Sequence, residues 1–309
     1  LILTWGGWER GLDLRALNVR VHSTNRSRPL ARIGELSVTL SARALVHGKI
    51  APTALEAIRP IVHLTRQTNG SFRIAIGDFN IANEETNQDL LSVLLDELSR
   101  PSDTGGRLKH LKKVSVIGAI LKVEDRKLGV TWGARDADLT VEHTPNGLRT
   151  VFNLTADMKT NSPMFDGEAY YDRTAKTIDV AATFSELNFR TLAQRFQALE
   201  DLKAIDTNVA GSVDVRIGID GAIQHAKFEM KSNSGTVSIP GVDTPPLEFR
   251  HLGLSGHLTR FPDQIKISSL TAAFDDTTAE AKGTLTRVGN VAALNGTLLV
   301  PEMSVNALR

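Results

Sequence analysis

The amino-acid sequence predicts a mainly β protein built as a meander of antiparallel hairpins. Runs in which apolar and polar residues alternate recur along the chain, and this period of two is typical of strands with one dry face and one wet face. Turn-forming pairs such as Asn-Gly and Asp-Gly punctuate these runs. Helical periodicity is confined to two or three short segments, too few to cover both faces of a parallel sheet. The sequence therefore disfavours a parallel α/β architecture.

The most informative element is a hairpin predicted over residues 213–230. Every second residue of its first strand is apolar, and Asp220-Gly221 tolerates the positive φ angles of a two-residue type I′ turn. In the register set by this turn, Asp214 lies opposite Lys227. Opposite charges then share one face and apolar side chains share the other, so turn chemistry and side-chain pairing agree.

Further alternating runs predict strands elsewhere in the chain, at residues 36–40, 72–76, 152–156 and 294–298. Most of the recurring turn pairs lie between strand-like runs: Asn69-Gly70, Asn146-Gly147, Asp166-Gly167, Gly289-Asn290 and Asn295-Gly296.

Three short helical segments are expected. Thr86 or Asn87 caps a leucine-rich stretch that Pro101 ends, and a second helix begins near Asn188 and runs to about residue 203. A single turn over residues 42–46 ends at Gly48. Polar and turn-forming residues cluster at 99–107, which divides the chain into a β segment over 1–100 that ends in a helix and a continuing β segment over 101–309.

Composition excludes several classes of protein. The 36 Lys and Arg side chains balance 35 Asp and Glu, so the chain as a whole has no charge that would attract nucleic acid, and no nucleic-acid partner is expected. The absence of cysteine excludes disulfides and thiolate metal sites. Residues 1–50 have an excess of basic side chains, which is either a solvated face or a segment close to anionic headgroups. Leu1-Ile2-Leu3 could be the trailing edge of an anchor or signal segment.

No motif in the sequence indicates catalysis. His251 and His257 share one face of a strand, but about 20 Å separates them there, too far for one metal ion. The carboxylate pairs Glu84-Glu85 and Asp275-Asp276 point apart as sequence neighbours, and the common phosphate, nucleophile and zinc motifs are missing. We therefore expect a protein that is not an enzyme and that uses no cofactor and no metal.

Taken in order, these elements resemble the AsmA-like superfamily of bacterial envelope proteins, and within it the YhdP-type branch. The resemblance covers most of the chain and rests on loose patterns of glycine, leucine and alternation. The segments that carry it are residues 32–41 and 44–50, residues 61–66 with the glycine turn at 69–72, Trp132 with the acidic run 136–139, and the helix-to-hairpin passage 187–221.

The resemblance implies an elongated, curled antiparallel β-sheet that forms an open groove in the periplasm. Such a groove would bind phospholipid acyl chains and help to move phospholipid between the inner and outer membranes. The family has an amino-terminal membrane helix that this sequence does not contain, so a parent protein would be held at the inner membrane by a segment outside it. Envelope proteins are possible further partners.

The residues expected to line the groove are the apolar members of the alternating strands: Phe72, Ile74, Ile76, Phe152, Leu154, Val213, Val215, Ile217, Ile219, Ala226, Phe228 and Met230. The same side chains could instead form half the core of a closed sandwich or barrel. In that alternative the protein is an envelope scaffold that binds protein partners by its strand edges.

Overall fold

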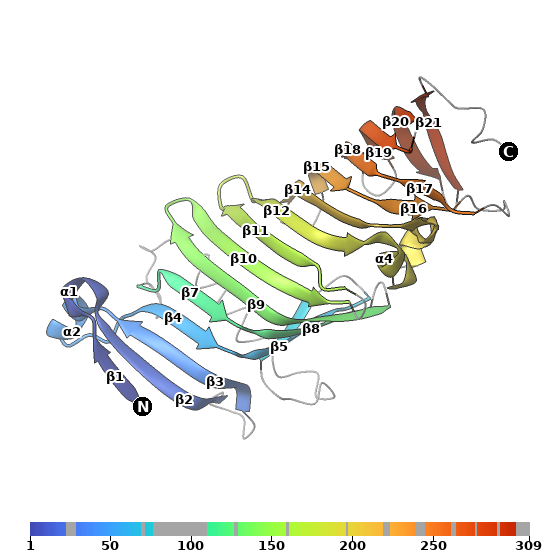
Figure 1. The fold of residues 1–309 in the computed structure, drawn as a ribbon. Coiled ribbons are helices and arrows are strands. Elements are labelled where there is room, and N and C mark those ends of the chain that lie inside the picture. Colours follow the sequence, from blue (N-terminus) through green and yellow to red (C-terminus); the bar gives the residue numbers. More distant parts are fainter. Residues whose placement is uncertain are drawn as a thin grey trace. The chain divides into compact units, whose positions relative to one another are not determined.

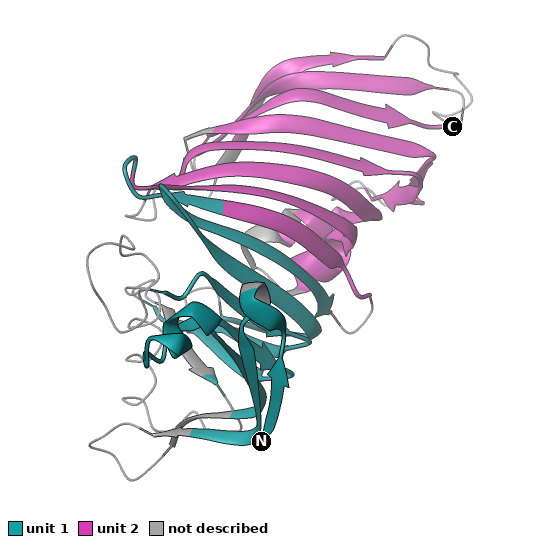
Figure 2. Ribbon diagram, turned by 90° about the vertical axis from the view of Figure 1, so that its left-hand side faces the viewer, with its two compact units in different colours: residues 1–157, 170–175 teal, residues 158–169, 176–309 magenta. Residues whose placement is uncertain are grey.

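A computed structural model describes residues 1–22, 29–68, 72–76, 110–126, 129–158, 161–195, 197–218, 223–238, 245–260, 264–275, 277–288 and 291–300. The fold is mainly β, as the sequence predicts, and its large mixed sheet is not closed into a barrel (Figure 1). The chain divides into two compact units, residues 1–157 with 170–175 and residues 158–169 with 176–309 (Figure 2).

Unit 1 contains two short helices and most of the strands of the first half of the chain. The helices are α1 (Gly7–Arg10) and α2 (Ala42–Val46). The strands are β1 (Ile2–Trp5), β2 (Leu12–His22), β3 (Pro29–Leu40), β4 (Pro52–Ile58), β5 (Ile61–Arg66), β6 (Phe72–Ile76), β7 (Lys113–Ile117), β8 (Ile120–Asp125), β9 (Val130–Thr144) and β10 (Gly147–Asp157). The turn predicted at 42–46 is confirmed as α2, which Ser41 caps and after which Gly48 has a φ of 68°.

Parallel pairing in unit 1 departs from the purely antiparallel sheet that was predicted. β4 and β5 pair in parallel with β7 and β8, and β3 makes one parallel contact with β6. The chain bends between β4 and β5 at Arg59 and between β7 and β8 at Gly118, where the φ angles are 50° and 62°. The two bends lie side by side. The amide of Arg59 donates to the carbonyl of Ile117 at 2.7 Å, and Asp138 accepts from the amide of Gly118 at 2.7 Å. Alternation within one strand reveals nothing about the direction of its neighbour.

Unit 2 is an antiparallel meander with a small structured region at one end. Its strands are β12 (Thr177–Asn188), β14 (Asn208–Gly218), β15 (Ile223–Ser232), β18 (His251–Arg260), β19 (Gln264–Ala273), β20 (Thr278–Val288) and β21 (Val291–Leu299), each paired with the next. β11 (Met164–Asp172) has residues in both units. The end region contains α4 (Phe189–Arg195), the 3₁₀ helix η1 (Gln197–Ala204) and a three-stranded sheet of β13 (Ile205–Asp206), β16 (Gly235–Val237) and β17 (Leu247–Phe249).

The predicted hairpin of residues 213–230 is confirmed as β14 and β15. Asp214 lies opposite Lys227 and Val213 opposite Phe228, as its turn chemistry predicts. At the last pair of these two strands the register shifts by one residue, so that Ile217 lies opposite Ile223. Hydrophobic patterning sets the register along the strands, whereas a bulge adjusts it at this end of the pair.

Two predicted turn pairs lie within strands. Asp166-Gly167 is part of β11 and Asn295-Gly296 is part of β21. Gly296 lies opposite Gly283, and a Cβ on Gly296 would lie only 2.3 Å from the carbonyl oxygen of Lys282. Glycine is therefore needed there for close strand approach and not for a turn, which is the other common reason for glycine in a strand.

The remaining predictions have mixed outcomes. The helix expected near 188–203 is confirmed as α4 followed by η1. The loop at Asn146 is confirmed, although Gly147 already begins β10 opposite Thr144. The helix expected after Thr86, the division at 99–107 and the turn pairs Asn69-Gly70, Asp220-Gly221 and Gly289-Asn290 lie outside the described residues.

Candidate functional site

Unit 2 has one continuous apolar face, because the register places apolar residues of successive strands side by side. Residues opposite one another across a strand pair point to the same face of the sheet. One row across the strands contains Val180, Val215, Ala226, Leu258, Ile265 and Leu285. A parallel row contains Phe184, Gly211, Met230, Leu254, Leu270, Ala281 and Leu298. The row between them contains Ala182, Val213, Phe228, Gly256, Ile267, Gly283 and Gly296.

Most side chains of this face are half-buried. Val213, Val215 and Ile217 on β14 and Phe228 and Met230 on β15 all fall in this class, whereas residues in a core between two layers are normally fully buried. Strand β21 is more open still, with Leu298 68% exposed. In the part of the chain that the structure describes, no second layer seals this face.

Two phenylalanine rings cover glycines on the same face. A Cβ on Gly256 would lie 2.7 Å from Cζ of Phe228, and a Cβ on Gly211 would lie 2.9 Å from Cζ of Phe184. The rings therefore lie across the backbone of the neighbouring strand. This arrangement shields the strand hydrogen bonds from water while keeping aromatic surface on the face.

One end of the face is covered by the α4 region. Val209 shares a side of β14 with Val213, yet it is only 2% exposed. Phe189 and Ala193 of α4 are 7% and 3% exposed, and Phe249 of β17 is 3% exposed. These buried side chains mark a small core at this end. The burial at this end indicates that α4 covers part of the apolar face.

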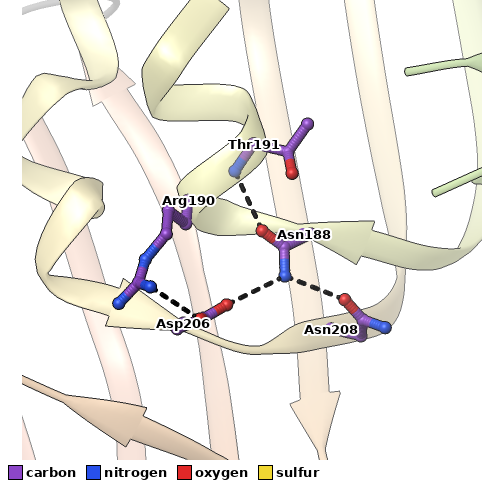
Figure 3. A network of polar contacts seen from close by, with 5 residues as sticks. All are labelled: Asn188, Arg190, Thr191, Asp206 and Asn208. Carbon is purple, nitrogen blue, oxygen red and sulfur yellow. Dashed lines mark hydrogen bonds and ion pairs between the residues drawn. The ribbon is translucent and has the colours of Figure 1, made fainter. Parts of the chain in front are cut away.

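A polar network fixes α4 to the strands (Figure 3). Asn188 precedes the helix, and its Oδ1 accepts a hydrogen bond of 2.9 Å from the amide of Thr191, which is an N-cap contact. Its Nδ2 donates to Asn208 at 3.0 Å and to Asp206 at 3.3 Å. Arg190 forms an ion pair of 2.8 Å with the same Asp206. The start of the helix is thus connected to both β13 and β14.

The opposite face of unit 2 is polar and charged. Arg216 forms an ion pair of 2.6 Å with Asp179, and its guanidinium donates a hydrogen bond to each carboxylate oxygen of that residue. These hydrogen bonds raise the pKa of the guanidinium above its ordinary value. Asp214 lies opposite Lys227, which is 3.5 Å from Glu229. The sheet is therefore strongly two-sided.

In unit 1 the remaining candidate residues also share one face. Ile74 lies in a row with Leu64, Val123 and Trp132, and Ile76 lies in a row with Val62, Leu121, Ala134 and Ala156. Leu154 precedes Ala156 on the same side of β10, and Phe152 lies opposite Leu139. Phe72 lies opposite Arg66, which forms an ion pair of 3.2 Å with Asp125.

The face of unit 1 is covered in part, whereas Leu139, opposite Phe152 on the same face, is 39% exposed. Leu111 and Leu148 are 3% and 8% exposed and form a buried cluster, against which Leu55, Val114, Val141 and Tyr171 pack. Val123 is 6% exposed and Ala134 1%. Among the candidates of this unit, Phe152 and Leu154 are half-buried.

Sequence reasoning missed much of the apolar face. The structure brings Val213, Val215, Ile217, Ala226, Phe228 and Met230 together in unit 2, while Ile219 lies outside the described residues. It adds Leu254, Leu258, Ile265, Leu270 and Leu285, which the alternation of single strands did not predict. The alternation of Leu252, Leu254 and Leu258 with small and polar residues was the available signal. His251 and His257 lie on the other side of this strand, and His257 is opposite Lys227 and Lys266.

The described residues contain no group of three or more His, Asp or Glu side chains that could hold a metal ion. Asp275 forms an ion pair of 2.7 Å with Arg250, whereas Glu84, Glu85 and Asp276 lie outside the described residues. Lys203 donates a hydrogen bond of 2.7 Å to Glu200, which lowers the pKa of that carboxyl.

In the described part of the chain, no helix has both the length and the apolar character needed to cross a membrane. Comparisons with family models, curated proteins and solved structures found no match for this chain.

Proposed function

We propose that the apolar face of unit 2 binds hydrocarbon chains of phospholipid. The observation that carries this proposal is the combination of continuity and incomplete cover. Apolar rows extend from β12 to β21, and their large described side chains outside the α4 end are half-buried or exposed, although the small side chain of Ala226 is buried. Exposed apolar patches of this kind mark sites of interaction with apolar partners.

The dimensions suit an acyl chain. β14 has 11 residues, which at about 3.3 Å per residue extend about 36 Å. A single acyl chain spans about half of a 30 Å hydrocarbon core, or about 15 Å. Each Å² of apolar surface removed from water contributes about 25 cal/mol, so occupancy of the face needs no chemical energy source. The charged outer face keeps such a sheet soluble in water.

The wider role follows from the resemblance to AsmA-like proteins of the YhdP type. We propose a non-enzymatic protein of the periplasm that helps to move phospholipid between the inner and outer membranes and so maintains the lipid composition of the outer membrane. Its partners are then phospholipid acyl chains and the inner membrane. The two-sided sheet supports this role because it offers an apolar surface that a lipid tail can follow.

Neighbouring residues of β20 provide a matched test. Leu285 lies on the apolar face opposite Ile265, and Thr284 lies on the outer face opposite Lys266. We expect the purified protein to retain phospholipid that mass spectrometry of its organic extract detects. Leu285→Asp should reduce that lipid several-fold, because a charge on the face must be desolvated when a tail binds. Thr284→Asp should leave the lipid content unchanged.

The comparison requires folded variants, which circular dichroism and thermal unfolding can establish. A lipid-free wild-type protein, or equal lipid loss in both folded variants, would contradict the proposal.

A second candidate function is an envelope scaffold that binds protein partners through a strand edge. β21 pairs with β20 alone among the described strands, and Leu298 and Leu299 are 68% and 56% exposed. Open edges accept added strands. A lipid-free preparation that contains a stoichiometric protein partner, lost on substitution Leu299→Pro, would favour this function over the first.

A further inference from the structure

One end of unit 1 carries two loops side by side. The β1–β2 and β3–β4 connections leave the sheet at the same end of the strands. One row across β1, β2, β3 and β4 at this end contains Trp5, Leu12, Leu40 and Pro52. The β1–β2 connection contains α1 and the β3–β4 connection contains α2. The two helices contact each other, as both ribbon views show (Figures 1 and 2).

Large apolar side chains project from these loops into solvent. Trp5 and Trp8 are 54% and 67% exposed, and Val46 and Ile50 are 66% and 80% exposed. The two indole rings contact each other edge to face, with their centroids 5.7 Å apart. Exposed side chains of this size, gathered at one end of a unit, form an interaction surface and not part of a core.

Basic side chains lie near these apolar side chains, and a carboxylate, Asp13, lies opposite Thr4 on β2. Arg43 and Lys49 are exposed in the α2 loop, and Lys112 is exposed beside Thr53, whose carbonyl accepts from its backbone amide. Among the described side chains of residues 1–8 and 41–51 there is no carboxylate. We call this surface the tip and define it by Trp5, Trp8, Arg43, Val46, Lys49, Ile50 and Lys112.

We infer that the tip docks onto the surface of an anionic lipid bilayer. Tryptophan is enriched at the level of the headgroups, where its ring is buried and its N–H stays hydrated. Aliphatic side chains such as Val46 and Ile50 enter the boundary of the acyl region, and neighbouring cations interact with anionic headgroups. The combination of tryptophan, aliphatic and basic side chains fits a bilayer better than it fits a protein, whose interface core is depleted of lysine.

This inference goes beyond the proposed function and does not depend on it. The tip belongs to unit 1, whereas the acyl-chain face proposed above belongs to unit 2. A protein that docks by its tip could bind membranes without carrying lipid, and the reverse also holds. The experiments can therefore separate the two.

Binding to vesicles gives the first test. We expect the full chain to float with vesicles of phosphatidylcholine mixed with phosphatidylglycerol. Its affinity for vesicles of phosphatidylcholine alone should be lower by about tenfold or more. Arg43→Glu combined with Lys49→Glu should reduce binding to the anionic vesicles by about tenfold or more. The matched control, Lys231→Glu combined with Lys282→Glu on the outer face of unit 2, should leave binding unchanged.

Tryptophan fluorescence gives the second test. In a Trp132→Phe background only Trp5 and Trp8 emit, and their emission should shift to the blue and be quenched by brominated lipid when anionic vesicles are added. Val46→Ser combined with Ile50→Ser should weaken binding several-fold. Val151→Ser, at an exposed apolar position of β10 outside the tip, is the control.

Absence of vesicle binding, equal loss in tip and control variants, or bound protein without a fluorescence shift would overturn the inference. If the tip instead joins two copies of the chain, light scattering without lipid will show a dimer that the tip variants abolish, and this result also overturns it. Lipid content of the purified tip variants should match that of the wild type, which separates failure at the tip from failure of the acyl-chain face.

Discussion

The two compact units use the same two-sided sheet, and each covers a different part of its apolar face while the rest stays half-buried. In unit 1, Leu111 precedes β7 and folds against the apolar face, where it buries Leu148. Among the described residues of unit 2, cover is clearest at the α4 end, where Val209 is buried while Val213 on the same side of β14 is half-buried. The difference teaches that alternation decides which side chains share a face, and that segments outside the strands decide whether the face meets water.

Truncation of one leucine in each unit tests this comparison most strongly. Leu148→Ala should lower the free energy of unfolding by about 3 kcal/mol, because it removes a buried side chain and leaves a cavity. Leu254→Ala in unit 2 should cost only about 1 kcal/mol, because Leu254 is half-buried and its site is open to solvent. Urea unfolding, with amide exchange followed separately in each unit, measures both. Similar losses would show that the face of unit 2 is as well covered at Leu254 as the face of unit 1 is at Leu148.

Ion pairs sharpen the same contrast. Arg66 and Asp125 have side chains 32% and 12% exposed, whereas Arg216 and Asp179 are 54% and 42% exposed. Asp125→Asn should therefore cost about 1 to 2 kcal/mol of unfolding free energy, because it leaves a partly desolvated guanidinium without its carboxylate. Asp179→Asn should cost clearly less. Addition of salt should diminish the effect of Asp179→Asn more than that of Asp125→Asn, since exposed pairs are screened more.

The covered end of unit 2 gives the smallest of the three effects. Asn188→Ala removes the N-cap of α4 and should cost about 1 kcal/mol, with faster amide exchange over residues 189–195. Asn208→Ala, which removes one hydrogen bond to Asn188 but keeps the cap, serves as the control. If exchange in α4 does not respond to Asn188→Ala, packing of Phe189 and Ala193 alone holds the helix in place.

Local patterns predicted the strands well and their neighbours poorly. The register of β14 and β15 could be derived because charge pairing and alternation agree over several residues, as at Asp214 and Lys227. The parallel pairing of β4 with β7 could not, because the partners are far apart in sequence and no turn links them. The pair Asn295-Gly296 predicts a turn, because glycine serves both turns and close strand contacts. Only the position of Gly296 opposite Gly283 separates the two roles.

The candidate face was predicted in part. The residues on β14 and β15 were found because their alternation is unbroken. Leu254 and Leu258 were not predicted, because glycines separate them from stronger apolar runs. A face that crosses several strands is defined by the register of all of them, and no single strand reveals it.

By itself, the sequence determined the mainly β fold, the two-sidedness of the strands and the position of α4, because each of these depends on the period of apolar residues and on local turn and capping chemistry. Only the tertiary structure decided which strands lie side by side in unit 1, that Leu111 covers one apolar face, and that Val213 remains half-buried on the other. Cover depends on contacts between residues distant in the chain, and no local period of hydrophobicity encodes them.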